Sequence, residues 1–295
     1  MFRAVYYKIK SYRLPEEFEG FRIVHLSDLH GAVYGKQNRK LIEGIQKARP
    51  DAVVMTGDMA DHSRHAIERL VGLSRRLCGR YPVYYVVGNH EQCLKESALT
   101  SLIRKLEAIG VTVLENSRHT ITRGNASVQL YGLVTPMVYY KDRLREYEKG
   151  IDFSAEEVRK ALGNADKRRF GILLAHNPLY YPSYRRWGAD LTFSGHIHGG
   201  IIRIPGLGGL LSPDLTLFPR YDGGYFQEKG KHLVVSRGLG NHFLVRVLNP
   251  PELVVATLHT GACRSQVPCE RNSICPLKSP AAMGHMLCSH NDIGP

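Results

Sequence analysis

Residues 21–31 read FRIVHLSDLHG, and this stretch carries the first of the signals that decide the fold. Its first seven residues are mostly apolar, which is typical of a strand buried inside an α/β domain. The strand runs directly into Asp28, Leu29, His30 and Gly31. An acidic residue and a histidine therefore follow the carboxyl end of a predicted strand, where open α/β sheets bind their ligands.

The same succession of strand, polar loop and helix occurs twice more. Residues 52–56 (AVVMT) form a predicted strand that runs into Gly57 and Asp58, and residues 82–87 (PVYYVV) form one that runs into GNHE at 88–91. Helices are predicted after the three loops, at about 37–48, 63–77 and 96–109. This repeated order predicts βαβ units with parallel strands.

The rest of the chain is predicted to be richer in strands. Ser154, followed three residues later by Glu157, indicates the start of a further helix. A strand at 170–175 ends at His176, and one at 190–194 ends at GHIH, residues 195–198. Short strands are also predicted at 111–114, 119–122, 127–133, 231–236, 243–248 and 252–258, with a long loop containing short strands at 200–228. We expect residues 1–259 to form one α/β domain and residues 260–295, which contain four of the six cysteines, to form a poorly ordered tail.

The composition excludes several classes of protein. With 43% hydrophobic and 23% charged residues among 295, the chain is neither wholly disordered nor fibrous. Its 40 Lys and Arg against 27 Asp and Glu give a formal charge of +13, which favours anionic partners. No apolar run approaches the roughly 20 residues that span a bilayer, and residues 1–8 lack the apolar core of a signal peptide. We therefore expect no transmembrane segment and a cytoplasmic location.

Five predicted strands end in residue types that bind metals: Asp28 with His30, Asp58, Asn89 with His90, His176, and His196 with His198. Carboxylate, amide and imidazole groups suit Mn, Fe, Zn, Co or Ni. Because no cysteine is among them, a structural zinc site with thiolate ligands is disfavoured. Two carboxylates, one asparagine and four imidazoles are too many ligands for one tetrahedral ion. They fit two adjacent divalent ions that share one carboxylate. Asp58 is the natural bridge because it follows the middle strand of the first three.

Residues around these ligands are expected to be structural. Gly57, Gly88 and Gly195 are expected to let the backbone turn sharply beside the ions. Four other histidines are expected to lie outside the ligand set: His25, as a packed residue of the first strand, and His62, His65 and His242. The aromatic pairs Tyr139–Tyr140 and Tyr180–Tyr181 are expected to pack in a core rather than to contact a substrate.

The five motifs resemble those of the calcineurin-like metallophosphoesterase superfamily. They are Asp28-Leu29-His30, GDMAD at 57–61, GNHE at 88–91, His176 and GHIH at 195–198, and the wider likeness covers about 21–258. Residues 21–31 and 194–200 are also similar to a bacterial branch of predicted phosphohydrolases, which includes enzymes similar to UDP-2,3-diacylglucosamine pyrophosphatase. The resemblance implies a four-layer α/β/β/α sandwich with two mixed sheets and two divalent metal ions at the sheet ends.

The resemblance also implies roles for individual residues. Asp28, His30 and His198 would hold one ion, Asn89, His176 and His196 would hold the other, and Asp58 would bridge them. His90 would face the substrate as the catalytic general acid, and Asp61 would support the site from behind the ligands. The implied reaction is hydrolysis of a phosphate mono- or diester or a pyrophosphate by attack of a metal-bridging hydroxide.

Alternatives to a small-molecule phosphoesterase stay open. A nuclease is suggested by the charge of +13, although only residues 64–80, with five basic residues and one acidic residue, form a basic cluster. A non-catalytic scaffold of the same fold would usually have lost ligands, and all are present here. Residues 1–13 hold four basic and no acidic residues, which suggests a lipid surface, but their alternation favours a strand. We expect a phosphate-ester small molecule, nucleotide or lipid as substrate, with nucleic acid less favoured.

Overall fold

Strands β2 (Arg22–Leu26), β3 (Ala52–Met55) and β4 (Val83–Tyr85) lie parallel and side by side, as the repeated strand, loop and helix pattern predicts. The computed structural model describes residues 1–140, 153–200, 202–204, 207–211, 217–240 and 246–261. All of them belong to the unit Met1–Cys263, and only this unit is described below. Apart from Thr260 and Gly261, the predicted tail lies outside the described residues.

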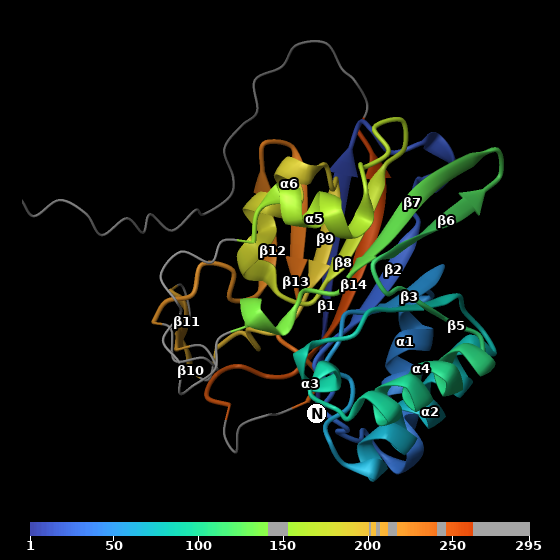
Figure 1. The fold of residues 1–295 in the computed structure, drawn as a ribbon, viewed down its shortest axis with the longest axis vertical. Coiled ribbons are helices and arrows are strands. Elements are labelled where there is room, and N and C mark those ends of the chain that lie inside the picture. Colours follow the sequence, from blue (N-terminus) through green and yellow to red (C-terminus); the bar gives the residue numbers. More distant parts are fainter. Residues whose placement is uncertain (141–152, 201, 205–206, 212–216, 241–245, 262–295) are drawn as a thin grey trace, which may run out of the picture. The chain divides into compact units, whose positions relative to one another are not determined.

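The first sheet has six strands in the order β1-β14-β2-β3-β4-β5 (Figure 1). Its remaining members are β1 (Arg3–Ser11), β5 (Val111–Val113) and β14 (Glu252–Thr260). Strand β14 pairs parallel with β1 and antiparallel with β2, so the sheet is mixed. The last strand of the described chain therefore lies between the first two.

The second sheet also has six strands, in the order β12-β13-β9-β8-β7-β6. Its four central strands are parallel, and the strand at each edge is antiparallel to its neighbour. The strands are β6 (Ser117–Arg123), β7 (Ala126–Leu133), β8 (Gly171–Ala175), β9 (Leu191–Ser194), β12 (Gly224–Glu228) and β13 (Lys231–Val235). A separate hairpin pairs β10 (Ile202–Ile204) with β11 (Gly208–Leu211).

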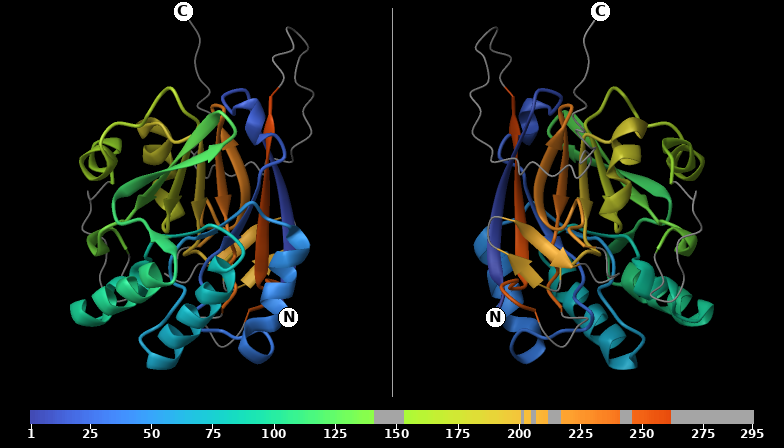
Figure 2. Two further views of the ribbon diagram at one scale, coloured as in Figure 1. Left: turned by 90° about the vertical axis from the view of Figure 1, so that its right-hand side faces the viewer. Right: turned by 90° about the vertical axis from the view of Figure 1, so that its left-hand side faces the viewer.

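The two sheets stack between two groups of helices (Figures 1 and 2). Three apolar clusters fill the interfaces between these four layers. In β3, Ala52 and Val54 face the second sheet, whereas Val53 and Met55 face the helices α1 (Arg39–Ala48), α2 (Arg64–Cys78) and α4 (Glu96–Ala108). Alternate side chains of a strand point to opposite faces, so an uninterrupted apolar strand is buried on both. The third cluster joins the second sheet to α5 (Ala155–Leu162) and α6 (Tyr181–Trp187). The predicted four-layer α/β/β/α sandwich is confirmed.

The starts of the helices follow local signals. Ser63 Oγ accepts a hydrogen bond from the Ala66 N–H at the start of α2, and Ser154 Oγ accepts one from the Glu157 N–H at the start of α5, as predicted. Two short helices escape prediction: α3 (Asn89–Gln92) lies in a segment interpreted as a loop, and α6 contains a proline in its first turn. Single 3₁₀ turns occur at Glu16–Phe18, Lys36–Asn38, Met137–Tyr139 and Pro178–Tyr180.

The predicted strand at 243–248 is wrong over the half that the structure describes. Residues 243–245 lie outside the described residues, and in 246–248 only Val247 pairs, through a single bridge to Ile202. Two prolines follow at 250 and 251, and proline cannot donate to a strand ladder. Within the described residues, no helix combines the length and the apolar character that crossing a membrane requires.

Candidate metal centre

The predicted ligands come together where strands of both sheets end. Asp28 follows β2, Asp58 follows β3, and the Asp28 N–H donates to the Gly57 carbonyl at 3.1 Å. In the second sheet, His176 follows β8, and its carbonyl accepts the N–H of Gly195 at 3.0 Å, beside β9. Backbone hydrogen bonds therefore hold neighbouring loops together independently of their side chains.

One group of ligand atoms contains Asp28, His30 and His198, whose oxygen and nitrogen atoms all lie within 4.8 Å of one another. His30 Nε2 is 3.3 Å from His198 Nε2, and His198 Nε2 is 3.4 Å from Asp28 Oδ1. Asp28 and His198 are buried. Buried nitrogen and carboxylate oxygen atoms converging on one point fit a divalent transition metal.

A second group contains Asp58, His176 and His196, again within 4.8 Å of one another. His176 Nε2 is 3.1 Å from Asp58 Oδ2 and 3.9 Å from Asp28 Oδ1, so the two groups adjoin. Asn89 Oδ1 is buried and has no hydrogen-bond partner among the described residues. A buried amide oxygen without a partner costs free energy, which ligation of a cation would remove. The donor set therefore fits a metal on this side as well.

Backbone strain is concentrated in the same residues. Five of the seven predicted ligands have positive φ: Asp28 at 51°, His30 at 45°, Asp58 at 51°, His196 at 68° and His198 at 54°. The left-handed conformation costs a non-glycine residue about 1–2 kcal/mol. Strain of this kind persists where function requires it. The loops thus hold these side chains in orientations that relaxed backbone would not give.

Of the three glycines expected to let the backbone turn sharply, only Gly57 has a positive φ, at 90°; the other two instead allow the loops to approach closely. A Cβ atom on Gly88 would lie 2.2 Å from Asp58 Oδ1, and one on Gly195 would lie 2.0 Å from Ser27 Oγ. Neither contact is compatible with a side chain. Because Gly88 directly precedes Asn89 and Gly195 directly precedes His196, the absence of a side chain at these two positions sets how near the ligands come to Asp58 and Asp28.

Without a metal, the pKa shifts favour the metal-binding forms of Asp58 and His198 but oppose them at two other predicted ligands, Asp28 and His176. Burial raises the pKa of Asp28 to about 6. Burial opposes ionisation of Asp58 too, but the adjacent His176 ring holds the pKa of Asp58 well below its usual value. Burial pushes the pKa of His198 well below the ordinary value, which keeps that imidazole neutral. At His176 burial lowers the pKa, but the Asp58 and Asp28 carboxylates outweigh it and raise the pKa to about 9. A neutral imidazole and an ionised carboxylate are the forms that ligate metals.

His90 lies on the more accessible side of the cluster. The backbone N–H of His90 donates to Asp58 Oδ1 at 2.8 Å, and the His90 ring packs edge-on against His30 with 4.7 Å between centroids. Its side chain is 19% exposed, against 2% for Asp58. A ring nitrogen of His90 also lies within 4.8 Å of the potential ligand atoms of His30 and Asp58. The metal content of a His90 variant therefore distinguishes a general acid from a metal ligand at this position.

Asp61 begins the turn into α2. Its Oδ1 accepts the Ser63 N–H at 2.7 Å. Partial burial opposes ionisation, but the hydrogen bonds from Ser63 lower its pKa. His62 is 6.1 Å from the His90 ring between centroids. Asp61 thus organises the turn before α2, and His62 lies beside His90.

Two contacts outside the predicted set support the ligands. His25 is fully buried, as expected, and its Nε2 lies 2.7 Å from Thr56 Oγ1. The Thr56 carbonyl in turn lies 2.6 Å from His176 Nδ1. Tyr140 is packed as predicted, but against the site, with its ring centroid 5.0 Å from that of His196. His242 lies outside the described residues.

Sequence reasoning missed the structural role of Glu91. Its carboxylate is fully buried and accepts four backbone N–H groups: Oε1 from Met59 at 2.7 Å and Ala60 at 3.0 Å, and Oε2 from Asp58 at 2.8 Å and Gly88 at 2.9 Å. Burial and the neighbouring Asp58 charge raise its pKa, and the hydrogen bonds from the Ala60, Gly88 and Asp58 N–H groups oppose the rise. Glu91 therefore clamps the Asp58 loop to the Asn89 turn.

Arg246 was also missed, since it lies 48 residues from the ligand that it contacts. Its guanidinium lies 3.1 Å from His198 Nδ1 and donates to the Arg237 carbonyl at 2.7 Å. No local motif marks such a residue.

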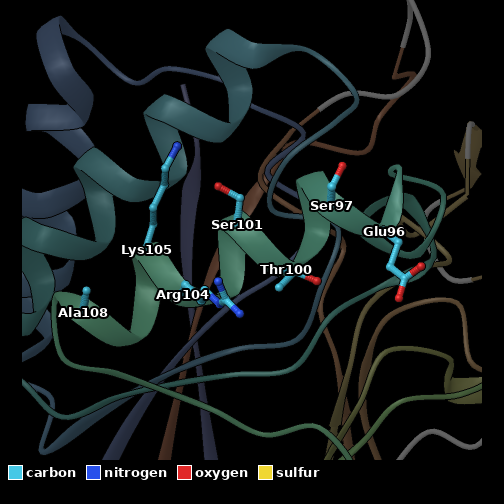
Figure 3. Close-up of a pocket in the computed structure, with 7 residues that line it drawn as sticks. All are labelled: Glu96, Ser97, Thr100, Ser101, Arg104, Lys105 and Ala108. Carbon is cyan, nitrogen blue, oxygen red and sulfur yellow. The ribbon is translucent and has the colours of Figure 1, made fainter.

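Hollows on the surface do not define the site. One of about 590 Å³ lies along α4, and Figure 3 shows the side chains that line it. They are Glu96, Ser97, Thr100, Ser101, Arg104, Lys105 and Ala108, none of which belongs to the predicted site. Another hollow, of about 320 Å³ between α2 and α4, reaches His62. The converging ligands, not a deep cavity, identify the functional region.

Residues 21–200, more than half of the chain, match the family of calcineurin-like phosphoesterases, and the chain belongs to this family. It is therefore a metal-dependent hydrolase that acts on phosphoester bonds. The metallophosphoesterase YkuE of Bacillus subtilis (strain 168) is 30% identical over 266 residues, which cover 88% of this chain and 86% of that protein.

A second relative carries a more specific name. The UDP-2,3-diacylglucosamine pyrophosphatase LpxG of Chlamydia muridarum (strain MoPn / Nigg) is 28% identical over 296 residues, covering 83% of this chain and 86% of that protein. Among solved structures, the phosphopantetheinyl hydrolase PptH from Mycobacterium tuberculosis aligns with a TM-score of 0.44 and 15% identity, over 77% of this chain and 91% of that chain.

Proposed function

We propose that the chain is a dinuclear metal-dependent phosphohydrolase that cleaves phosphate mono- or diesters or pyrophosphates. The observation that carries this proposal is the pair of adjoining ligand groups around Asp58 and Asp28. Asp28, His30 and His198 would hold one ion, Asn89, His176 and His196 would hold the other, and Asp58 would be shared by both. The metal would be Mn, Fe, Zn, Co or Ni, as the mixture of imidazole and carboxylate ligands favours.

When bound, two divalent ions lower the pKa of a coordinated water and neutralise charge on the phosphoryl oxygens. The chain supplies the remaining chemistry. His90, at the accessible side of the cluster, donates a proton to the departing oxygen, a role worth typically ~10²–10⁴-fold in rate. The Asp58 carboxylate accepts a hydrogen bond from the backbone N–H of His90 and so fixes the start of the turn that carries both Asn89 and His90.

The substrate class is narrowed by the relatives but not fixed by the site. The name of LpxG supports including nucleotide-linked pyrophosphates among the candidates. The formal charge of +13 suits any anionic ester. Small phosphate esters, nucleotide pyrophosphates and lipid-linked phosphates are therefore the candidates, ahead of nucleic acid.

A panel assay tests this function. The purified full chain is loaded in turn with Mn²⁺, Fe²⁺, Co²⁺, Zn²⁺ and Mg²⁺. Each form is assayed on p-nitrophenyl phosphate, bis-p-nitrophenyl phosphate, a UDP-sugar and single-stranded DNA. We expect metal-dependent release of phosphate, nitrophenol or UMP, and two ions per chain by elemental analysis. Hydrolysis of no ester with any metal would favour the non-catalytic scaffold, and cleavage of DNA alone would favour the nuclease.

A further inference from the structure

Helices α2 and α4 lie side by side on the outer face of the first sheet, and a groove runs between them (Figure 1). Two hollows, of about 460 Å³ and about 320 Å³, make up this α2–α4 groove and share Ile67, Glu68 and Lys105. Its apolar lining is mostly half-buried and consists of Ile67, Val71, Leu94, Ala98, Leu102, Ala108 and Ile109. The groove therefore offers apolar surface that the described chain leaves partly uncovered.

A glycine in the wall of the groove has no explanation within the described chain. Gly72 lies in the middle of α2, where glycine is the least favourable residue after proline. A Cβ atom at Gly72 would meet no atom of the surrounding described residues within 4 Å. Gly44 in α1 differs, because its Cβ would lie 2.8 Å from the Phe2 ring and close packing excludes a side chain there. The bare backbone at Gly72 instead suits the close approach of a molecule from outside.

The groove also carries positive charge that the described chain does not neutralise. Arg64 pairs with Glu68 at 3.0 Å, so the charges of these two lining residues cancel. Arg75 and Lys105 are exposed on the two walls, and no acidic side chain of the described residues pairs with either. Both lie in the last turn of their helix, but a helix end carries only about half a unit of negative charge. Most of each positive charge is therefore available to a partner.

We propose that the α2–α4 groove docks an amphipathic acidic helix of a partner protein, with an apolar side chain over Gly72 and acidic side chains against Arg75 and Lys105. Amphipathic helices bind by laying their apolar face into a groove of this kind, and opposite charges at its rim set their orientation. The described residues that line the groove include no Phe, Tyr or Trp on which nucleic-acid bases would stack. Two copies of a chain with a formal charge of +13 repel each other.

One end of the groove lies beside the metal centre. His62 lines the hollow at that end, and its ring is 6.1 Å from the His90 ring between centroids. A docked helix would therefore extend to the neighbourhood of His90. The docking itself does not depend on the proposed hydrolysis, because the residues that carry it are not among the predicted ligands.

Binding of a synthetic peptide to the purified full chain tests the proposal. The probe is a fluorescent peptide of about 18 residues, with Leu at helical spacing on one face and Glu on the positions that flank it. The control peptide has Lys in place of every Glu, and binding is measured by fluorescence anisotropy. We expect a Kd of about 10–100 μM for the Glu peptide and binding at least about ten-fold weaker for the Lys peptide.

Two variants at one position test the groove. Gly72→Leu fills it, and leucine is a far better helix former than glycine, so the melting temperature should rise rather than fall. Binding of the Glu peptide should weaken at least about ten-fold. Gly72→Ala is the matched control: it should also raise the melting temperature, but its single methyl group should weaken binding by no more than about three-fold.

Two double variants test the charge. Arg75→Glu together with Lys105→Glu should weaken binding of the Glu peptide about ten-fold or more. The control pair is Lys8→Glu with Lys10→Glu, which changes exposed residues on β1, at the other edge of the first sheet from β4 and β5. Because salt screens charges that far from the groove, this pair should weaken binding by less than about two-fold.

The docking proposal is overturned if both peptides bind equally, if the Glu peptide does not bind at about 1 mM, or if Gly72→Leu binds it normally. An oligonucleotide that binds more tightly than the Glu peptide and is blocked by Gly72→Leu would overturn it in favour of nucleic acid. Sedimentation of the unmodified chain as a dimer and of Gly72→Leu as a monomer would overturn it in favour of a second copy. Every variant should retain hydrolysis of bis-p-nitrophenyl phosphate. Peptide binding by a chain that hydrolyses no ester would overturn the phosphohydrolase and leave the docking in place.

Discussion

Glu91→Gln should destabilise the protein far more than an ordinary change from a carboxylate to an amide. Each carboxylate oxygen accepts two backbone N–H groups, and the carboxylate is fully buried. In glutamine one oxygen becomes an NH₂ donor. Whichever way the amide turns, it directs that donor at two N–H groups that then lack an acceptor.

The magnitude follows from the bonds that are lost. Hydrogen bonds to a charged group are worth about 1.5–3 kcal/mol each. Two are lost, the other two become neutral, and the buried charge disappears, which offsets part of the loss. We expect the free energy of unfolding to fall by about 3–5 kcal/mol. The same change loosens the Asp58 loop and the Asn89 turn, so affinity for both ions should fall about 10–100-fold.

Urea denaturation and metal titration, both on purified full chains, measure the two effects. The matched control is Glu96→Gln, an exposed glutamate at the start of α4, which should change stability by less than about 0.5 kcal/mol. A Glu91→Gln chain with the stability and metal affinity of the control would refute the clamp. Loss of stability with normal metal affinity would show that the clamp supports the fold but does not position the ligands.

Three further predictions concern single groups. His90→Gln should keep both ions by elemental analysis and lose about 10²–10⁴-fold in kcat; loss of an ion would make His90 a ligand. Asp58→Asn should lower occupancy of both ions together, and loss of only one would contradict the bridge. Glu19 accepts hydrogen bonds from Thr260 and lies beside the His259 ring. The hydrogen bonds from Thr260 and the contact with His259 lower the pKa of Glu19 from 4.5 to about 2. Its stabilisation is complete above pH 4.5 and is lost as the pH falls toward 2, so Glu19→Gln should flatten that part of a thermal-denaturation profile.

The sequence predicts the convergence of the ligands because parallel strands share a direction. Asp28, Asp58 and Asn89 each follow a strand that runs the same way, so strand order alone brings them to one edge. The apolar runs likewise predict burial on both faces, which requires helices on one side and a second sheet on the other. Both inferences depend only on local pattern and on the geometry of a sheet.

Long-range pairings account for what the sequence does not predict. Strand β14 pairs with both β1 and β2, and nothing in its own residues specifies neighbours more than two hundred positions away. Glu91 binds backbone N–H groups of residues 58–60, and a backbone partner leaves no trace in the identity of the side chains there. The cytoplasmic location and the tail at 260–295 stay predictions.

The backbone strain in the loops that carry the predicted ligands is maintained by contacts that hold these loops in place. Five predicted ligands lie in the left-handed region, and at a cost of about 1–2 kcal/mol each, isolated loops would relax out of it. They are prevented from relaxing by contacts that leave no room: the Asp58 carboxylate against Gly88, the Asp28 carboxylate against Gly195, and four N–H groups on Glu91. Because these restraints are backbone contacts and a buried carboxylate, they persist whichever metal is bound. The geometry of the predicted ligands is therefore set largely by the chain, and metal binding would complete a site that is already organised.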